Sequence, residues 1–177
     1  MSERRERLTA APFRLDGKQA DWVEDTLASM STEDRLRQLF CLITYSDNEE
    51  DLRRLAEQIR PGGIMSRAVP TEQALRTIRT LQEYSHIPML ISANLESGGN
   101  GLLSDGSFFA RPMAIAATDD TEQARRLGEI CGTEGAAVGA NWSFAPIVDI
   151  DYNWRNPITN TRTFGSDPER VRRMGVA

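Results

Sequence analysis

The architecture of this chain is easiest to recognise in the stretch Pro88-Met-Leu-Ile-Ser-Ala-Asn-Leu-Glu-Ser-Gly-Gly99, where a short apolar run ends in polar residues and glycines. The stretch Asn141-Trp-Ser-Phe-Ala-Pro-Ile-Val-Asp-Ile-Asp151 has the same form, and Asn156-Pro-Ile-Thr-Asn-Thr-Arg-Thr-Phe-Gly165 follows it. Buried strands end in this way in parallel α/β folds, where the carboxyl edge of the sheet binds a polar ligand. These segments therefore predict two strands whose carboxyl ends contribute to one ligand site.

The rest of the sequence adds further strands that alternate with helices. Two more apolar runs have the length of buried strands, so that four are predicted, at residues 39–44, 63–66, 88–93 and 141–150. Helical spacing or a capping pattern predicts the helices, at residues 21–30, 51–59, 71–81, 118–131 and 166–177, with a short one from residue 31. Thr71 is the expected cap of the third of these helices, and Ala124, Leu127 and Cys131 are the expected inward residues of the helix at 118–131. Such alternation is typical of a parallel sheet joined by crossover helices.

We predict an α/β fold that forms part of a TIM-like (β/α)8 barrel, namely about its first four strand-helix units. A closed barrel requires eight units and about 250 residues, whereas this sequence has 177 residues and ends within a predicted helix. A small open α/β sheet is the alternative. In the barrel interpretation, residues 1–20 are an N-terminal extension and residues 21–177 form the half-barrel.

Composition excludes several classes of function. The formal net charge of −5 disfavours nucleic acid or an anionic membrane surface as a partner. The charged opening residues lack the apolar core of a signal peptide, and no apolar run reaches the roughly 20 residues that span a bilayer. The only histidine is His86, and Cys41 and Cys131 lie in apolar segments typical of buried thiols. We therefore expect no metal, no cofactor and a cytoplasmic location.

Five segments in a fixed order resemble the N-terminal domain of the family 3 glycoside hydrolases, and the resemblance is closest to the β-N-acetylhexosaminidase and β-glucosidase branch. They are Met30-Ser-Thr-Glu-Asp-Arg-Leu-Arg-Gln-Leu-Phe40, Pro61-Gly-Gly-Ile64, Leu90-Ile-Ser-Ala-Asn-Leu-Glu-Ser-Gly-Gly99, Asn141-Trp-Ser-Phe-Ala-Pro-Ile-Val-Asp149 and Thr161-Arg-Thr-Phe-Gly-Ser-Asp-Pro168. The similarity extends over roughly residues 20 to 177.

The resemblance implies a metal-free, retaining exo-β-glycosidase that acts on terminal β-linked N-acetylglucosamine or glucose. In such an enzyme a carboxylate attacks the anomeric carbon while an acid protonates the leaving oxygen. The family's nucleophile and acid/base would fall beyond Ala177, so we expect these 177 residues to be inactive alone. The expected partners are a carbohydrate and either the missing C-terminal half or a second copy. A non-catalytic carbohydrate-binding protein and a structural half-barrel are the alternatives.

Three residues are the candidate substrate-binding residues, and none is assigned as catalytic or as a metal ligand. By the resemblance, Asn94 stands where the family commonly has an aspartate that binds sugar hydroxyls, and its alternative role is a local hydrogen bond to the backbone at the strand end. Glu96 matches the family's loop carboxylate before the glycines, and it either orients Asn94 or an arginine or is solvated. Arg162 matches the arginine of the family's Arg-Ser/Thr-Phe-Gly motif. Its alternative is a structural salt bridge to Asp149 or Asp151.

The second segment offers other candidates as well. If it is a strand, Asp149 and Asp151 share a face. They could form a general acid/base pair, but accepting backbone N–H groups of the following loop is the favoured interpretation. Trp142 and Phe144 are predicted to be core residues of the fourth strand, whereas Trp154 lies among polar residues and is a candidate platform for a sugar face.

Overall fold

The computed structural model describes residues 3–177, and its contacts divide the chain into two compact units that meet in sequence at Leu39 and Phe40. The first unit contains three helices, α1 (Glu3–Thr9), α2 (Gly17–Ser29) and α3 (Thr32–Arg37). A capping box formed by Asp16 and Gln19 begins α2, because each side chain binds the backbone N–H of the other residue. The predicted boundary at residue 20 stays a prediction.

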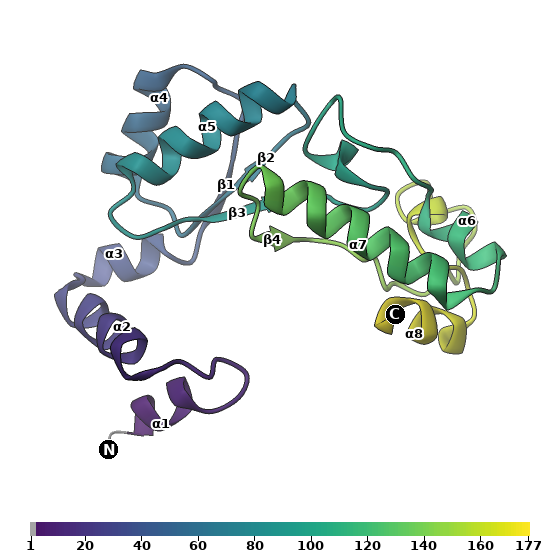
Figure 1. Cartoon of the computed structure of the whole chain (residues 1–177), viewed down its shortest axis with the longest axis horizontal. Helices are drawn as coiled ribbons and strands as arrows, with labels where there is room; N and C mark the ends of the chain where they lie inside the picture. The colour runs from purple at the N-terminus through teal and green to yellow at the C-terminus, as the bar shows by residue number, and fades with distance from the viewer. Residues whose placement is uncertain (1–2) are drawn as a thin grey trace. The chain divides into compact units, whose positions relative to one another are not determined.

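The second unit is built on a parallel sheet, as the alternation of elements predicts (Figure 1). Its strands lie in the order β1 (Cys41–Thr44), β2 (Gly63–Ser66), β3 (Leu90–Ala93) and β4 (Trp142–Ser143). Every neighbouring pair is parallel. Sequential order in a parallel sheet requires each crossover to return to the next position, which is how a (β/α) barrel grows. The prediction of a partial barrel is confirmed.

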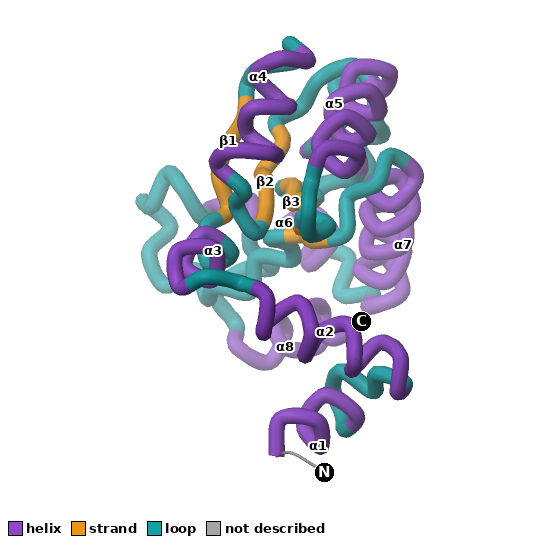
Figure 2. Tube along the Cα trace, turned by 90° about the vertical axis from the view of Figure 1, so that its left-hand side faces the viewer, coloured by secondary structure: helices purple, strands orange, loops and turns teal. Residues whose placement is uncertain are grey.

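Helices follow each strand of the second unit. They are α4 (Glu49–Arg54), α5 (Thr71–Tyr84), α6 (Pro112–Ala117), α7 (Thr121–Ala137) and α8 (Pro168–Val176). A π-helical turn, Leu55–Ile59, continues α4, and Figure 2 shows α5 and α7 on the same side of strands β1 to β3. Polar side chains begin several of these helices. Asp120 and Asp167 accept backbone N–H groups at the starts of α7 and α8.

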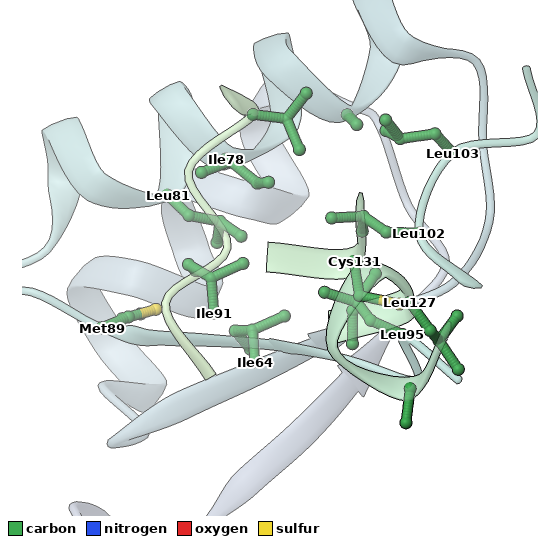
Figure 3. Close-up of a cluster of buried hydrophobic side chains, with 14 of the residues drawn as sticks. Ile64, Ile78, Leu81, Met89, Ile91, Leu95, Leu102, Leu103, Leu127 and Cys131 are labelled. Carbon is green, nitrogen blue, oxygen red and sulfur yellow. The ribbon is translucent and has the colours of Figure 1, made fainter. Parts of the chain in front are cut away.

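The hydrophobic core lies between the helices and one face of the sheet. Ile64 of β2 and Ile91 of β3 are adjacent in the register and fully buried, and they meet Ile78 and Leu81 of α5 (Figure 3). The predicted inward residues of α7 are confirmed, since Leu127 and its neighbours Ala124 and Cys131 are buried. Side chains alternate along a strand, so the remaining strand residues lie on the opposite face.

That opposite face of the sheet is mostly apolar, and within the described residues several of its side chains are exposed although Ser92 is buried. One row of the register joins Ile43, Met65, Ser92 and Trp142. Ile43 is 46% exposed and Trp142 38% exposed, and Leu90 on the same face is 48% exposed. The prediction that Trp142 and Phe144 are core residues is therefore wrong. They contact each other, with ring centroids 4.7 Å apart, on the side of the sheet that the helices do not cover.

The fourth strand is much shorter than its apolar sequence predicts. Only Trp142 and Ser143 pair with β3, because Pro146 has no N–H to donate and restricts the residue before it. Ile147 makes an isolated bridge to Thr163 instead. Asp149 and Asp151 therefore lie outside any strand, which removes the basis for placing them on one face. The buried Oδ1 of Asp151 accepts no hydrogen bond. The prediction that Asp151 accepts backbone N–H groups of the following loop is therefore also wrong for this atom.

Candidate functional site

A two-point ion pair between Glu96 and Arg162 lies beyond the carboxyl end of β3. The Arg162 Nε donates to Glu96 Oε2 at 2.8 Å, and its Nη2 donates to Oε1 at 2.6 Å. The Glu96 side chain is 7% exposed and the Arg162 side chain 34% exposed. A planar guanidinium matches a carboxylate in this geometry, so the pair fixes the direction of both side chains.

Local structure brings each partner to this place. Glu96 follows β3 by a few residues, in a turn where its own N–H donates to the carbonyl of Asn94 at 3.0 Å. Arg162 ends a single 3-10 turn, Asn160–Arg162, and the next residue, Thr163, is buried. Asn156 accepts the N–H of Ile158 at 2.9 Å and so shapes the chain before that turn. The loop after β3 and the segment after β4 therefore come together at Glu96 and Arg162.

The electrostatics of the pair follow from its geometry. The hydrogen bond to Glu96 raises the pKa of Arg162 above its usual value, and the charge of Asp149 adds to this effect from a greater distance. The predicted alternative partners of Arg162 were Asp149 and Asp151, but the structure gives Glu96. Glu96 therefore lies where it can orient Arg162, and its part in substrate binding stays a prediction.

Asn94 is the first residue after β3 and has a carboxamide that is free to bind. It is half-buried, and within residues 3–177 its side chain makes no hydrogen bond. Its backbone carbonyl is packed tightly, since a Cβ added to Gly101 would lie 1.7 Å from the Asn94 oxygen. Only glycine therefore fits at position 101 while the backbone of Asn94 stays where it is. The amide can therefore donate to or accept from a ligand without losing an internal partner.

The loop of residues 97–110 is held from outside the sheet. Glu134 of α7 accepts the N–H of Ser107 at 2.9 Å, and Asp105 accepts both the N–H and the hydroxyl of Thr71. We expected Thr71 to cap its own helix, but Asp105 supplies the oxygen for the first turn of α5 instead. These hydrogen bonds therefore fix the position of the loop that follows Asn94 and Glu96.

The sequence analysis missed Arg111, which precedes α6 at the end of this loop. Its Nη1 lies 3.9 Å from Glu96 Oε2, and its side chain is 49% exposed. The signal that would have drawn attention to it is its place between a long irregular loop and Pro112, where an arginine has no role in starting a helix.

One cavity, of about 300 Å³, is mostly apolar and is lined by Glu96, Leu95, Phe164 and Met174 among others. Another, of about 150 Å³, lies at the carboxyl ends of β1 and β2 and is lined by Thr44, Ser66, Thr77 and Arg67 among others. Trp154 is 73% exposed and has the guanidinium of Arg155 at 5.1 Å from its ring centroid.

Neither a metal-binding cluster nor a membrane-spanning helix occurs among the described residues. Residues 3–177 contain no group of three or more histidine, cysteine, aspartate or glutamate side chains that could hold a metal ion. None of the helices between Glu3 and Ala177 has the length and apolar content needed to cross a bilayer. Beyond the carboxyl end of β3, Glu96, Arg162 and Asn94 carry groups that can form directed hydrogen bonds, and their role as a ligand site stays a prediction.

Comparison with known proteins gives a consistent result. The sequence profile of the Glycosyl hydrolase family 3 N terminal domain matches residues 31–177. A β-N-acetylglucosaminidase/β-glucosidase from Cellulomonas fimi is 48% identical over 169 residues, which is 96% of this chain and 30% of that protein.

Solved structures agree with this result. The β-glucoside phosphorylase BglX bound to 2FGlc has a TM-score of 0.88 and 45% identity, over 95% of this chain and 31% of that one. A family 3 β-N-acetylglucosaminidase from Paenibacillus sp. has a TM-score of 0.76 and 29% identity, over 83% and 30% respectively. The chain thus spans about 30% of the length of these relatives.

Proposed function

Because this chain belongs to glycosyl hydrolase family 3 through its N-terminal domain, we propose that it holds the terminal sugar of a retaining exo-β-glycosidase. The substrate is a terminal β-linked N-acetylglucosamine or glucose. Both sugars occur in the name of the Cellulomonas fimi relative. Residues 21–177 form the N-terminal half of the catalytic barrel in this proposal, and residues 1–20 extend it.

The observation that carries the proposal is the pairing of Glu96 and Arg162 beside Asn94. The pair leaves some N–H groups of Arg162 without a carboxylate partner, so the guanidinium can donate to sugar hydroxyls while Glu96 fixes its orientation. Asn94 adds one donor and one acceptor within the same strand end. Several directed hydrogen bonds from a rigid strand end are what the recognition of one pyranose requires.

The same geometry assigns Glu96 to positioning. Both oxygens of its carboxylate already accept hydrogen bonds from Arg162, and the side chain is buried. A carboxylate used in this way is not available to attack an anomeric carbon or to protonate a leaving oxygen. We therefore assign no catalytic residue within this sequence, and the proposal places the nucleophile and the acid/base beyond residue 177. Alone, these residues bind sugar and do not cleave it.

The uncovered face of the sheet supports a protein partner. Ile43, Leu90 and Trp142 expose apolar surface there, and burial of such surface is favourable. The remaining strands of a barrel would cover this face, and a second copy is the alternative partner. The cytoplasmic location stays a prediction.

Transfer to phosphate is a second candidate reaction. The 45% identical solved structure is that of a β-glucoside phosphorylase, and that protein has much the same fold over 95% of this chain. A phosphorylase and a hydrolase can share a sugar site and a glycosyl-enzyme, since they differ in whether phosphate or water releases the sugar.

Two experiments test these proposals. The gene product that contains these residues is assayed with nitrophenyl β-N-acetylglucosaminide and β-glucoside, in phosphate-free buffer and with added phosphate. Release of nitrophenol with free sugar supports hydrolysis, whereas formation of a sugar 1-phosphate supports phosphorolysis. No release under either condition would contradict both and leave a non-catalytic sugar-binding protein.

The second experiment uses the 177-residue chain alone and measures monosaccharide binding by NMR titration. Saturable binding of N-acetylglucosamine or glucose without any release of nitrophenol is the expected result. Cleavage by this chain alone would contradict the assignment of catalysis to residues outside it.

A further inference from the structure

Glu96 is contacted by more positive charge than its own carboxylate requires. Arg162 supplies two hydrogen bonds, one to each carboxylate oxygen, and so neutralises the buried charge in the best available geometry. Arg111 nevertheless approaches the same Oε2 atom, with its Nη1 at 3.9 Å. This distance is too long for a hydrogen bond, so charge alone holds the second guanidinium there.

Arg111 keeps its donors free. Throughout residues 3–177 its guanidinium donates no hydrogen bond, and Glu96 is the only carboxylate at ion-pair distance from it. Its side chain is about half exposed, so the guanidinium is accessible to water or to a ligand. Arg162, by contrast, uses Nε and Nη2 on Glu96 and directs Nη1 towards the carbonyl of Ile158 at 3.4 Å.

The surroundings of Arg111 do not otherwise favour a positive charge. Arg111 is the residue before the first turn of α6, where the helix dipole disfavours a cation. Two guanidinium groups that share one carboxylate oxygen also repel each other. Asp149 is the other acidic group that acts here, and it influences Arg162 from beyond ion-pair distance. A guanidinium held in this position is better placed to bind a ligand than to stabilise the fold.

We propose that Arg111 is a second substrate-binding guanidinium, which donates to hydroxyl or carbonyl oxygens of the same sugar that Asn94 and Arg162 contact. Glu96 lies between the two arginines and aligns both. This inference rests on the proposed function, because it requires a sugar at the carboxyl end of β3. It differs from a structural salt bridge in predicting that the Arg111 donors form hydrogen bonds when the ligand binds.

The test compares Arg111→Met with a matched control in the 177-residue chain. Arg126→Met is the control, since Arg126 is similarly exposed and makes only a surface ion pair with Glu122 at 3.4 Å on α7. We expect Arg111→Met to weaken binding of N-acetylglucosamine or glucose about five- to tenfold, which is the effect of one lost charge-assisted hydrogen bond. The control variant should bind as the parent does. Both variants should unfold at the parental temperature.

A spectroscopic readout separates binding from structural support. In the parent chain, the Arg111 Nε–H resonance should shift on sugar addition, with the same midpoint as the backbone resonance of Asn94. Arg111→Lys keeps the positive charge but lacks the planar guanidinium with its several N–H donors, so it should recover only part of the affinity. If Arg111→Met fails to fold, the lysine variant and the resonance shift decide the question.

The outcomes distinguish this inference from the proposed function. A parent chain that binds sugar, with unchanged affinity in Arg111→Met and no shift of the Arg111 resonance, would overturn the inference and leave the proposed function intact. A parent chain that binds none of the sugars would overturn both.

Discussion

The guanidinium of Arg162 and the carboxylate of Glu96 form two hydrogen bonds, of 2.6 and 2.8 Å, across 66 residues of sequence. The pair joins the loop after β3 to the turn before α8. It is the only direct contact between charged groups of the two segments that suggested a ligand site from sequence, among the residues that the structure describes.

Replacing either partner of this pair should destabilise the chain, and the loss of stability should be larger when Arg162 is replaced than when Glu96 is replaced. Arg162→Met removes both hydrogen bonds to the buried Glu96 carboxylate and leaves only the longer ion pair with Arg111, so we expect the free energy of unfolding to fall by about 2–3 kcal/mol. Glu96→Gln removes the charge but keeps two polar atoms, so we expect a loss of about 1 kcal/mol. Urea unfolding of both single variants and of the double variant measures the coupling free energy between the two side chains. If the losses in free energy of unfolding are additive, the contact between Glu96 and Arg162 contributes nothing to stability.

Asn94 should control affinity without affecting stability. Asn94→Asp introduces a charged acceptor, which should tighten sugar binding by about 1 kcal/mol, or roughly fivefold. Asn94→Ala should weaken binding. Because the Asn94 carboxamide has no hydrogen bond to the rest of residues 3–177, both variants should unfold as the parent does. NMR titration with the monosaccharide and urea unfolding measure the two effects, and a large change in stability would show that Asn94 has a structural role.

Gly101 should not tolerate a larger residue. Its added Cβ would meet the carbonyl of Asn94 at 1.7 Å, so Gly101→Ala must displace the strand end that carries Asn94. We expect lost sugar binding and a destabilisation of about 2 kcal/mol. Gly128→Ala is the control, because no atom lies within 4 Å of its added Cβ and alanine favours the helix. Parental binding in Gly101→Ala would contradict the role of this close approach.

The packing of α8 should depend on pH through Asp119. A hydrogen bond from Arg173 at 2.8 Å, with the charges of Arg173 and Arg170, lowers the pKa of Asp119 below its usual 3.8. A lowered pKa in the folded chain stabilises it at pH values above the unfolded pKa, and this contribution disappears as the pH falls through the folded pKa.

Asp119→Asn tests this dependence and is compatible with the left-handed backbone at this position, where φ is 53°. The stability advantage of the parent over Asp119→Asn should be complete above the usual carboxyl pKa of 3.8 and should shrink as the pH falls below it. Thermal unfolding from pH 2 to pH 7 measures the difference. A difference that does not change with pH would assign the effect to packing.

The two thiols should report on the two faces of the sheet. Cys131 is buried among the helices, and desolvation raises its pKa, so little thiolate is available to react. Cys41 is half-buried on the uncovered face, next to Ser92. Maleimide should therefore modify Cys41 first in the isolated chain. Protection of Cys41 in the longer gene product would support coverage of this face, and equal rates for both thiols in the isolated chain would contradict the assignment.

Much of the fold could be predicted because it depends on local patterns. The runs at residues 63–66 and 88–93 are strands, and the spacing of Ala124, Leu127 and Cys131 correctly predicted the buried side of α7. The failed prediction for Trp142 and Phe144 has a physical cause. Both have the composition of core residues, but apolar composition does not tell which face of a sheet is covered.

The candidate site was predictable residue by residue but not as an arrangement. The sequence alone placed Asn94, Glu96 and Arg162 after strands, because a strand that ends in polar residues in a parallel sheet directs them to its carboxyl edge. Which carboxylate would meet Arg162, and that Arg111 would approach the same oxygen, depended on how two long loops fold back over the sheet. Contacts between residues so far apart in sequence are set by packing of the whole unit, and no local pattern of side chains encodes them.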